Sequence, residues 1–299
     1  MITTLDQIVE LVKARPAKRL AVAAAEDPHT IEAVGRAVKE KLVRAVLTGD
    51  EKAIRKVAAE NKVDAGGFEI LHEPDKAKAL ALAVGLVRGG KADFLMKGLL
   101  DSSVYIRGII DKEQGLLPPG RLLSHVSVIQ VPAWKKLIIC GDVAVIPAPD
   151  LEAKVAILNY AIEVAHKLGI ERPKAALVSA VEKINPKMPS TTEAAIIAKM
   201  ADRGQIKGAI VDGPLALDAA FSKESARIKG LESPVAGDAD ILVFPSIEVG
   251  NVFFKASTYL AKGELGAVVA GARCPCVLTS RGDSENTKFY SIALGSLLA

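Results

Sequence analysis

The chain has 299 residues, of which 50% are hydrophobic, 25% are charged and 4% are aromatic, and its formal net charge is +4. This length suffices for one large domain or two medium ones with an aliphatic core. The scarcity of aromatic side chains and the scattered basic residues exclude a nucleic acid or a membrane surface as the expected partner, whereas a mild positive charge suits a small polyanionic ligand.

Apolar runs and helix signals alternate along the first part of the chain. Strands are expected at 20–25, 43–48, 68–71 and 93–96, and helices at 5–14, from Asp27-Pro28 onward, at 51–60, at 76–88 and at 99–112. Such alternation predicts an α/β protein with a parallel sheet that helices cover on both faces.

The pattern changes near residue 125, where we place a domain boundary. Residues 125–131 and 137–140 indicate a hairpin-like pair, and 143–146 an extended segment. Asp150 is expected to cap the next helix and Gly169 to end it. A strand at 175–179 follows, then a helix that Ser190 opens, with Glu193 completing a capping box. A strand at 208–211 and a partly helical segment at 215–228 complete this part.

The last part contains apolar runs at 241–244, 267–270 and 276–278, an amphipathic stretch after the first run, and a closing helix at 289–298. Ser280, Arg281 and Asp283 follow the last run directly. Ligands of parallel sheets bind just beyond the carboxyl ends of the strands. A hydroxyl, a guanidinium and a carboxylate at such an end predict a site for an anionic substrate.

Other strand ends also carry polar residues. The basic candidates for phosphate binding are Lys97, Lys183, Lys187, Lys255 and Arg281. The four histidines are spaced too far apart to predict a metal site. The residues alone therefore support a two-domain α/β protein with an anion site between the domains.

The start of the chain, MITTLDQIVELVKARP, predicts an amphipathic helix and not a signal peptide. Charged residues or glycine interrupt every apolar run before it reaches the length of a membrane span. The three cysteines are an odd number and lie in apolar surroundings, which indicates that they are reduced thiols of an intracellular protein. We expect a cytoplasmic protein.

Two segments, FPSIEVGNVFFKASTYLA and GARCPCVLTSRGDSENTKFYSIALG, resemble the phosphate acetyl/butyryltransferase family. Four more match in the family's order: GKADFLMKGLLDSSVYIRG at 90–108, SHVSV at 124–128, KINPKMPSTTEA at 183–194 and VDGPLALDAAFS at 211–222. The GLLDSS, PKMPST and DGPLALD versions are more similar to the butyryl branch than to the acetyl branch.

The resemblance implies two α/β domains of the isocitrate/isopropylmalate dehydrogenase-like fold, with the second inserted in the first. Residues 1–125 plus 282–299 would form domain I and residues 126–281 domain II, with the active cleft between them. It implies reversible transfer of an acyl group from an acyl-CoA, here butyryl-CoA, to phosphate. Coenzyme A is then a substrate, with no permanently bound cofactor and no metal, and a homodimer or larger homo-oligomer is expected.

The resemblance also implies roles for residues. Ser280 and Arg281 would be catalytic, and Asp283 would be the general base, with Glu285 as the alternative, because the family's aspartate position is Thr287 here. The phosphate-binding set would be Lys97, Ser102, Ser103, Arg107 and Lys183, and the coenzyme A-binding set Ser246, Gly250, Asn251 and Lys255.

Three alternatives remain. The first is a phosphate acetyltransferase. The second is a metal-dependent hydroxyacid dehydrogenase-like enzyme, for which Asp238 and Asp240 are the one close aspartate pair of interest, although they precede a strand. The third is a non-catalytic CoA-binding protein, which Thr287 at the family's aspartate position would favour.

Overall fold

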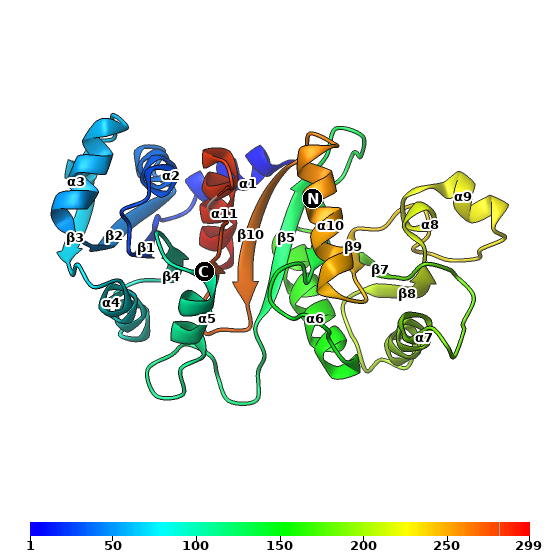
Figure 1. Cartoon of the computed structure of the whole chain (residues 1–299). Coiled ribbons are helices and arrows are strands. Elements are labelled where there is room, and N and C mark those ends of the chain that lie inside the picture. Colours follow the sequence, from blue (N-terminus) through cyan, green and yellow to red (C-terminus); the bar gives the residue numbers. More distant parts are fainter. Residues whose placement is uncertain (281) are drawn as a thin grey trace. The chain divides into compact units, whose positions relative to one another are not determined.

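The computed structural model describes residues 1–280 and 282–299. The chain divides into two compact units (Figure 1). The first unit comprises Leu5–Leu123 and Glu264–Ala299, and the second comprises Met1–Thr4 and Ser124–Gly263. Each contains mainly parallel strands flanked by helices, so the predicted α/β class is confirmed.

The strands of the first unit follow the order β3-β2-β1-β4-β11-β10. All neighbours in this order are parallel except β10 and β11, which are antiparallel. Their bounds are β1 (Lys18–Ala23), β2 (Val43–Gly49), β3 (Phe68–His72), β4 (Phe94–Lys97), β10 (Glu264–Ala270) and β11 (Cys276–Val277). Residues 20–25 are fully buried, as expected for a parallel strand covered on both faces.

The helices of this unit are α1 (Leu5–Lys13), α2 (Pro28–Lys39), α3 (Glu51–Glu60), α4 (Lys76–Arg88), α5 (Ser102–Ile110) and α11 (Glu285–Leu298), with a short 3₁₀ turn at Ala65–Gly67. In Figure 1, α2 and α11 lie on one face of the sheet and α4 and α5 on the other. Asp27, Asp50 and Asp75 begin three of these helices, because their carboxylates accept hydrogen bonds from N–H groups of the first turn.

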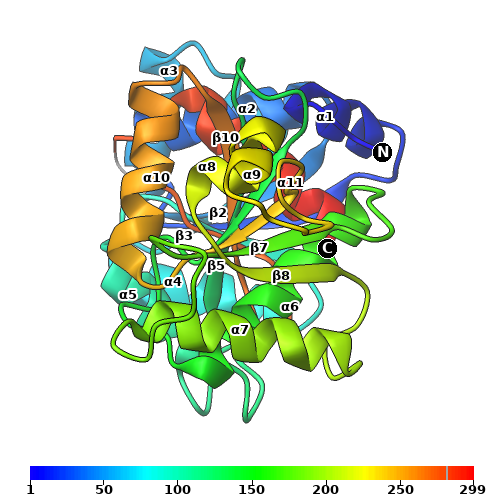
Figure 2. The same ribbon diagram turned by 90° about the vertical axis from the view of Figure 1, so that its right-hand side faces the viewer.

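The second unit has the strand order β5-β6-β9-β7-β8, in which β5 and β6 form the predicted antiparallel pair. Its strands are β5 (Ser124–Gln130), β6 (Ile138–Gly141), β7 (Lys174–Val178), β8 (Ile210–Leu215) and β9 (Ile241–Val243). Its helices are α6 (Leu151–Lys167), α7 (Pro189–Asp202), α8 (Leu217–Phe221), α9 (Lys223–Ile228) and α10 (Ile247–Tyr259). Figure 2 shows α6 and α7 on one side of β7 and β8, and α8 and α9 on the other.

Several predicted boundaries were wrong. The helix expected at 99–112 begins at Ser102 and ends at Ile110. The capping box is absent from α7, because Met188 is the N-cap residue and the Glu193 carboxylate instead contacts the buried ammonium of Lys154. Residues 143–145 form bends, and no strand is formed at 143–146.

The closing helix α11 begins one turn earlier than predicted. Ser284 caps it by accepting a hydrogen bond from the N–H of Thr287. Its polar first turn shows no apolar periodicity, which is why the sequence placed the start at Phe289. From Lys288 to Leu297 every residue is buried, so α11 packs inside the first unit on nearly all sides.

In the division into compact units the chain returns to the first unit at Glu264, whereas the predicted domain I resumes at residue 282. The reason is that β10 and β11 belong to the sheet of the first unit, where β11 pairs with β4. That the two units are separate domains stays a prediction.

Within the described residues, none of the helices combines the length and the apolar character that crossing a membrane requires.

Candidate active site

The carboxyl ends of β1, β4 and β11 lie side by side in the first unit. Ala23 pairs with Lys97 across β1 and β4, and Val277 pairs with Met96 across β11 and β4. Because all three strands run in the same direction, the residues that follow them emerge at one edge of the sheet. This edge therefore brings Lys97 and the Thr279–Ser280 segment together, at the position where parallel sheets bind ligands.

Gly98 allows the segments that follow β1 and β4 to approach closely. Its N–H donates to the carbonyl of Ala23 over 2.9 Å, and a Cβ at this position would lie 2.1 Å from the carbonyl oxygen of Ala24. Ala24 itself has a φ of 53°, a left-handed conformation. The edge of the sheet thus depends on a residue without a side chain at position 98.

Lys97 is buried and its ammonium is bound by main-chain carbonyls. It donates to the oxygen of Leu100 over 3.0 Å and is 3.5 Å from that of Gly98. The lysine therefore stabilises the loop that leads into α5 and places a cation at the strand end. Its predicted contact with phosphate stays a prediction.

The N-terminal turn of α5 carries the other expected phosphate contacts of this unit. Ser102 and Ser103 are its first two residues, and both are exposed. Arg107 is exposed on the same helix, where its Nε donates to the carbonyl of Ser103 over 3.3 Å. Free N–H groups of a helix start, together with two hydroxyls and a guanidinium, are suited to an anion.

Two of the predicted catalytic residues, Ser280 and Asp283, follow β11 and contact each other. The main-chain N–H of Ser280 donates to Oδ2 of Asp283 over 2.7 Å, and the N–H of Asp283 donates to the carbonyl of Ser280 over 3.2 Å. Ser280 is exposed, and its hydroxyl oxygen accepts from the N–H of Gly282 over 3.4 Å. Arg281 lies outside the described residues.

Lys288 is a residue of this site that the sequence analysis missed. It is 3% exposed, and its Nζ donates to Oγ1 of Thr279 over 3.2 Å and to the carbonyl of Ser280 over 3.1 Å. Burial lowers the pKa of Lys288, while the carboxylates of Asp27 and Asp283 act in the opposite direction. In the sequence Lys288 is the last residue before the closing helix predicted at 289–298, so nothing in the local pattern marked it as buried.

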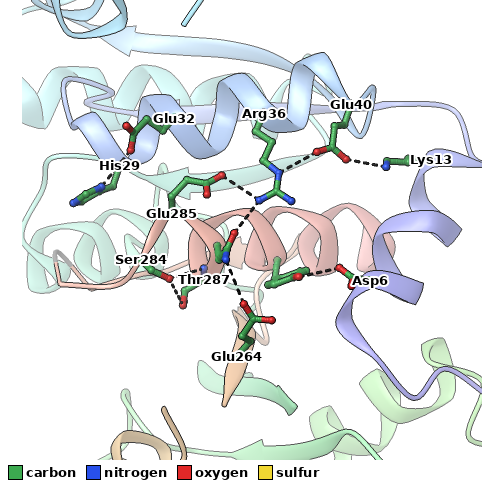
Figure 3. Close-up of polar contacts among 12 residues, drawn as sticks. Asp6, Lys13, His29, Glu32, Arg36, Glu40, Glu264, Ser284, Glu285 and Thr287 are labelled. Atoms are coloured by element: carbon green, nitrogen blue, oxygen red, sulfur yellow. Dashed lines mark hydrogen bonds and ion pairs between the residues drawn. The ribbon is translucent and has the colours of Figure 1, made fainter. Parts of the chain in front are cut away.

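Glu285, the alternative general base, is engaged with a different partner. Its Oε1 lies 3.3 Å from Nη1 of Arg36 on α2 (Figure 3). The Nε of the same arginine lies 3.0 Å from Oε1 of Glu40. The guanidinium carbon of Arg36 lies 3.7 Å from the centroid of the Phe289 ring. This cluster packs α2 against the first turn of α11, so we assign Glu285 a part in that helix contact.

The expected coenzyme A-binding residues lie on α10 of the second unit. Ser246 is its N-cap residue. A hydrogen bond from the Ser246 hydroxyl to the Glu248 carboxylate lowers the pKa of that carboxyl. A Cβ on Gly250 would lie 2.6 Å from the carbonyl oxygen of Asp142, and the Asn251 amide donates to the carbonyl of Val143 over 3.1 Å. Gly250 and Asn251 therefore hold α10 against the loop that follows β6.

That loop is organised by the buried carboxylate of Asp142. It accepts hydrogen bonds from the N–H groups of His125 at 3.1 Å, Ala144 at 2.8 Å and Val145 at 2.9 Å. Lys255 lies farther along α10, with its Nζ 5.3 Å from the ring centroid of Phe254 and 5.9 Å from that of Tyr259.

The predicted site residues fall into two groups. Lys97, Ser102, Ser103, Arg107, Ser280 and Asp283 belong to the first unit, whereas Lys183 and the α10 residues belong to the second. Lys183 is exposed in the loop before α7. Asp238 and Asp240, the pair considered for a metal, instead contact the ammonium of Lys136 at 2.8 and 2.7 Å. In the described part of the chain, no group of three or more His, Cys, Asp or Glu residues could hold a metal ion.

The chain is similar to known proteins over almost its whole length. A family profile described as "Phosphate acetyl/butaryl transferase" matches residues 3–81 and 72–296. A phosphate butyryltransferase from Clostridium acetobutylicum is 46% identical over 299 residues, which cover 100% of this chain and 99% of the relative. A phosphate acetyltransferase from Thermotoga maritima is 45% identical over 295 residues, covering 99% of each chain.

Among solved structures, a branched-chain phosphotransacylase from Enterococcus faecalis V583 superposes with a TM-score of 0.82 at 34% identity, over 94% of this chain and 98% of the other. Sequence and structural similarity thus agree from end to end. The chain belongs to the phosphate acetyl/butyryl transferase family.

Proposed function

We propose that this protein transfers a short acyl group reversibly between coenzyme A and inorganic phosphate, with butyryl-CoA as the preferred acyl donor. The observation that carries the proposal is the 46% identity to a phosphate butyryltransferase over the full length of both chains. A phosphate acetyltransferase is 45% identical, so acetyl-CoA is kept as the alternative donor. The preference for butyryl rests on the GLLDSS, PKMPST and DGPLALD segments.

The proposed reaction needs no covalent enzyme intermediate. A phosphate oxygen attacks the carbonyl carbon of the thioester, a C–O bond forms, the C–S bond breaks and coenzyme A leaves as the thiolate, which then takes up a proton. In the reverse direction a carboxylate removes the proton from the thiol before sulfur attacks the acyl phosphate. Both substrates must therefore occupy one site together, where fixed donors stabilise the negative charge on the carbonyl oxygen.

Ser280 and Asp283 are the proposed centre of this chemistry. Ser280 would donate its hydroxyl to the carbonyl oxygen or to the departing sulfur, and Asp283 would be the general base. The 2.7 Å bond between the Ser280 N–H and the Asp283 carboxylate supports this pairing. The contact of Glu285 with Arg36 supports Asp283 over Glu285. Arg281 is proposed to bind phosphate, on the evidence of the sequence.

The remaining substrate contacts are proposals as well. Phosphate would be bound by Lys97, Ser102, Ser103, Arg107 and Lys183, and coenzyme A by Ser246, Gly250, Asn251 and Lys255. The inserted, dehydrogenase-like domain arrangement with a cleft between the domains stays a prediction. So do the homo-oligomeric state, the absence of a permanent cofactor and the cytoplasmic location.

The test is a direct assay of thiol release from butyryl-CoA, with and without phosphate, and with acetyl-CoA in parallel. Phosphate-dependent release that Arg281→Ala abolishes is the expected result, and a higher kcat/KM for butyryl-CoA would identify the preferred donor. Coenzyme A binding without release from either donor would overturn the proposal and favour the non-catalytic CoA-binding alternative.

A further inference from the structure

A buried ammonium contacts the main chain of the proposed catalytic serine. Lys288, in the first turn of α11, is 3% exposed, and its neighbour Thr279 is equally buried. The ammonium donates to the hydroxyl of Thr279 at 3.2 Å and to the carbonyl of Ser280 at 3.1 Å. Asp27, the residue that caps α2, lies 3.9 Å away with its Oδ2. Lys288 thus joins three segments: the start of α2, the end of β11 and the start of α11.

Burying the ammonium of Lys288 costs free energy, and packing alone does not explain why a lysine occupies this position. An ammonium loses its hydration on burial, which disfavours the charged form. Burial accordingly lowers the pKa of Lys288, although the carboxylates of Asp27 and Asp283 oppose the effect. Two of the next buried residues of the same helix, Phe289 and Ile292, are apolar. An apolar side chain at position 288 would fill the same interior at lower cost.

The contacts of Lys288 hold the main chain of Ser280 from one side, while Asp283 holds it from the other. The carbonyl of Ser280 accepts from Lys288, and its N–H donates to Asp283 over 2.7 Å. With both main-chain groups engaged, these contacts hold the main chain of Ser280 and therefore the direction of its Cα–Cβ bond. Small displacements of a reacting group lower reaction rates strongly. Contacts that fix the position of Ser280 are therefore expected to increase the rate of acyl transfer.

We infer that Lys288 is a positioning residue for acyl transfer: its ammonium, bound to Thr279 and to the Ser280 carbonyl, fixes the turn that presents the Ser280 hydroxyl to the substrates. The inference rests on the proposed function. Lys288 acts through Ser280 and does not itself contact the substrates. Its contribution is therefore expected in kcat, with substrate binding largely retained.

The first test is Lys288→Met, which keeps an unbranched side chain of similar volume and removes the ammonium. We expect kcat to fall at least about 30-fold, while the KM values for butyryl-CoA and phosphate change less than about threefold. Thr279→Val keeps the lysine and removes one acceptor, and a smaller loss of kcat, about three- to tenfold, is expected. Lys136→Met is the matched control, because Lys136 is a largely buried lysine bound to Asp238 and Asp240 in the second unit.

A second test separates positioning from filling of space. Lys288→Ala should regain part of its kcat when ethylammonium is added, and ethanol of similar size should have no such effect. Circular dichroism and thermal melting report whether each variant is folded, and Thr279→Val supplies the test if both Lys288 variants fail to fold. A folded Lys288→Met or Thr279→Val enzyme with wild-type kcat, or equal recovery with ethanol, would overturn the inference. Failure of the wild-type enzyme in the same assay would instead refute the proposed function.

Discussion

The N–H of Ser280 and the carboxylate of Asp283 are joined by a 2.7 Å hydrogen bond, and the N–H of Asp283 returns a 3.2 Å bond to the carbonyl of Ser280. The two residues close a turn at the carboxyl end of β11. A serine hydroxyl and a carboxylate are therefore presented as one unit, with relative positions fixed by the main chain. Reactions that need a donor and a base at a fixed separation benefit from this arrangement.

Asp283→Asn should lower kcat in the direction from butyryl phosphate and coenzyme A, because the amide cannot remove the thiol proton. We expect a loss of about 10²- to 10⁴-fold. The asparagine oxygen can still accept from the Ser280 N–H, so the turn should persist and stability should change little. Initial rates at saturating substrates provide the measurement. Full activity in Asp283→Asn, together with loss in Glu285→Gln, would instead identify Glu285 as the base.

The close approach of β1 and β4 predicts a cost for any side chain at position 98. In Gly98→Ala the new Cβ would lie 2.1 Å from the carbonyl oxygen of Ala24, which is main chain and must shift as a unit. We expect the free energy of unfolding to fall by about 2–4 kcal/mol, and kcat to fall with it, because the same segment carries Lys97. Urea unfolding followed by circular dichroism measures the first effect.

Gly85→Ala is the matched control for this prediction. Gly85 is an exposed residue of α4, and a Cβ added there would meet no heavy atom of a neighbouring residue within 4 Å. Alanine has the higher helix propensity, so stability should rise by about 0.5–1 kcal/mol. Equal effects of the two substitutions would contradict the role of close approach at Gly98.

The stability of the second unit should depend on pH through Asp238. Burial raises the pKa of this carboxyl, but hydrogen bonds from Lys136 and Lys174 outweigh burial and lower it from 3.8 to about 2. A carboxyl with a lowered pKa in the folded state stabilises the protein above pH 4, and this contribution is lost as the pH falls from about 4 to 2. Since the side chain is 33% exposed, we discount the shift for solvent screening and expect about 1 kcal/mol.

Asp238→Asn tests this dependence. At pH 7 the variant should be less stable than the wild type by that amount, and the two stability curves should converge at acidic pH. Asp202→Asn, which alters an exposed ion pair with Lys199, should change stability by less than about 0.5 kcal/mol. A difference between Asp238→Asn and the wild type that does not vary with pH would show that packing and not charge is responsible.

The order of strands and helices in the first part of the chain could be predicted because apolar runs and helix signals alternate there. Asp27-Pro28 is such a signal, and Asp27 caps α2 in the structure, as Asp50 and Asp75 cap α3 and α4. The turn at Ser280 and Asp283 could be located as well, because polar residues follow an apolar run there. Ser280 and Asp283, the proposed centre of the chemistry, follow the end of β11 directly, and this is a local property of the sequence.

What could not be predicted depends on contacts between distant segments. Lys288 appears in the sequence as the last polar residue before an apolar helix, and only the packing of α11 against β11 and the start of α2 shows it to be buried beside Thr279 and Asp27. The return of the chain at Glu264 depends likewise on the pairing of β11 with β4. Glu193 matched a capping box, but a buried lysine 39 residues away along the chain binds its carboxylate instead.

Lys255 on α10 provides a test of the proposed coenzyme A site. Its Nζ lies 5.3 Å from the ring centroid of Phe254 and 5.9 Å from that of Tyr259, and the residue is half-buried. If it pairs with a phosphate of coenzyme A, Lys255→Ala should raise the KM for butyryl-CoA about three- to tenfold and leave the KM for phosphate unchanged. The effect should shrink as ionic strength increases, because salt screens such a pair. Lys56→Ala, which removes an exposed lysine of α3 in the first unit, should leave both KM values unchanged. Equal increases of the two KM values in Lys255→Ala would place this lysine outside the coenzyme A site, since a residue that binds one substrate alone should not weaken both.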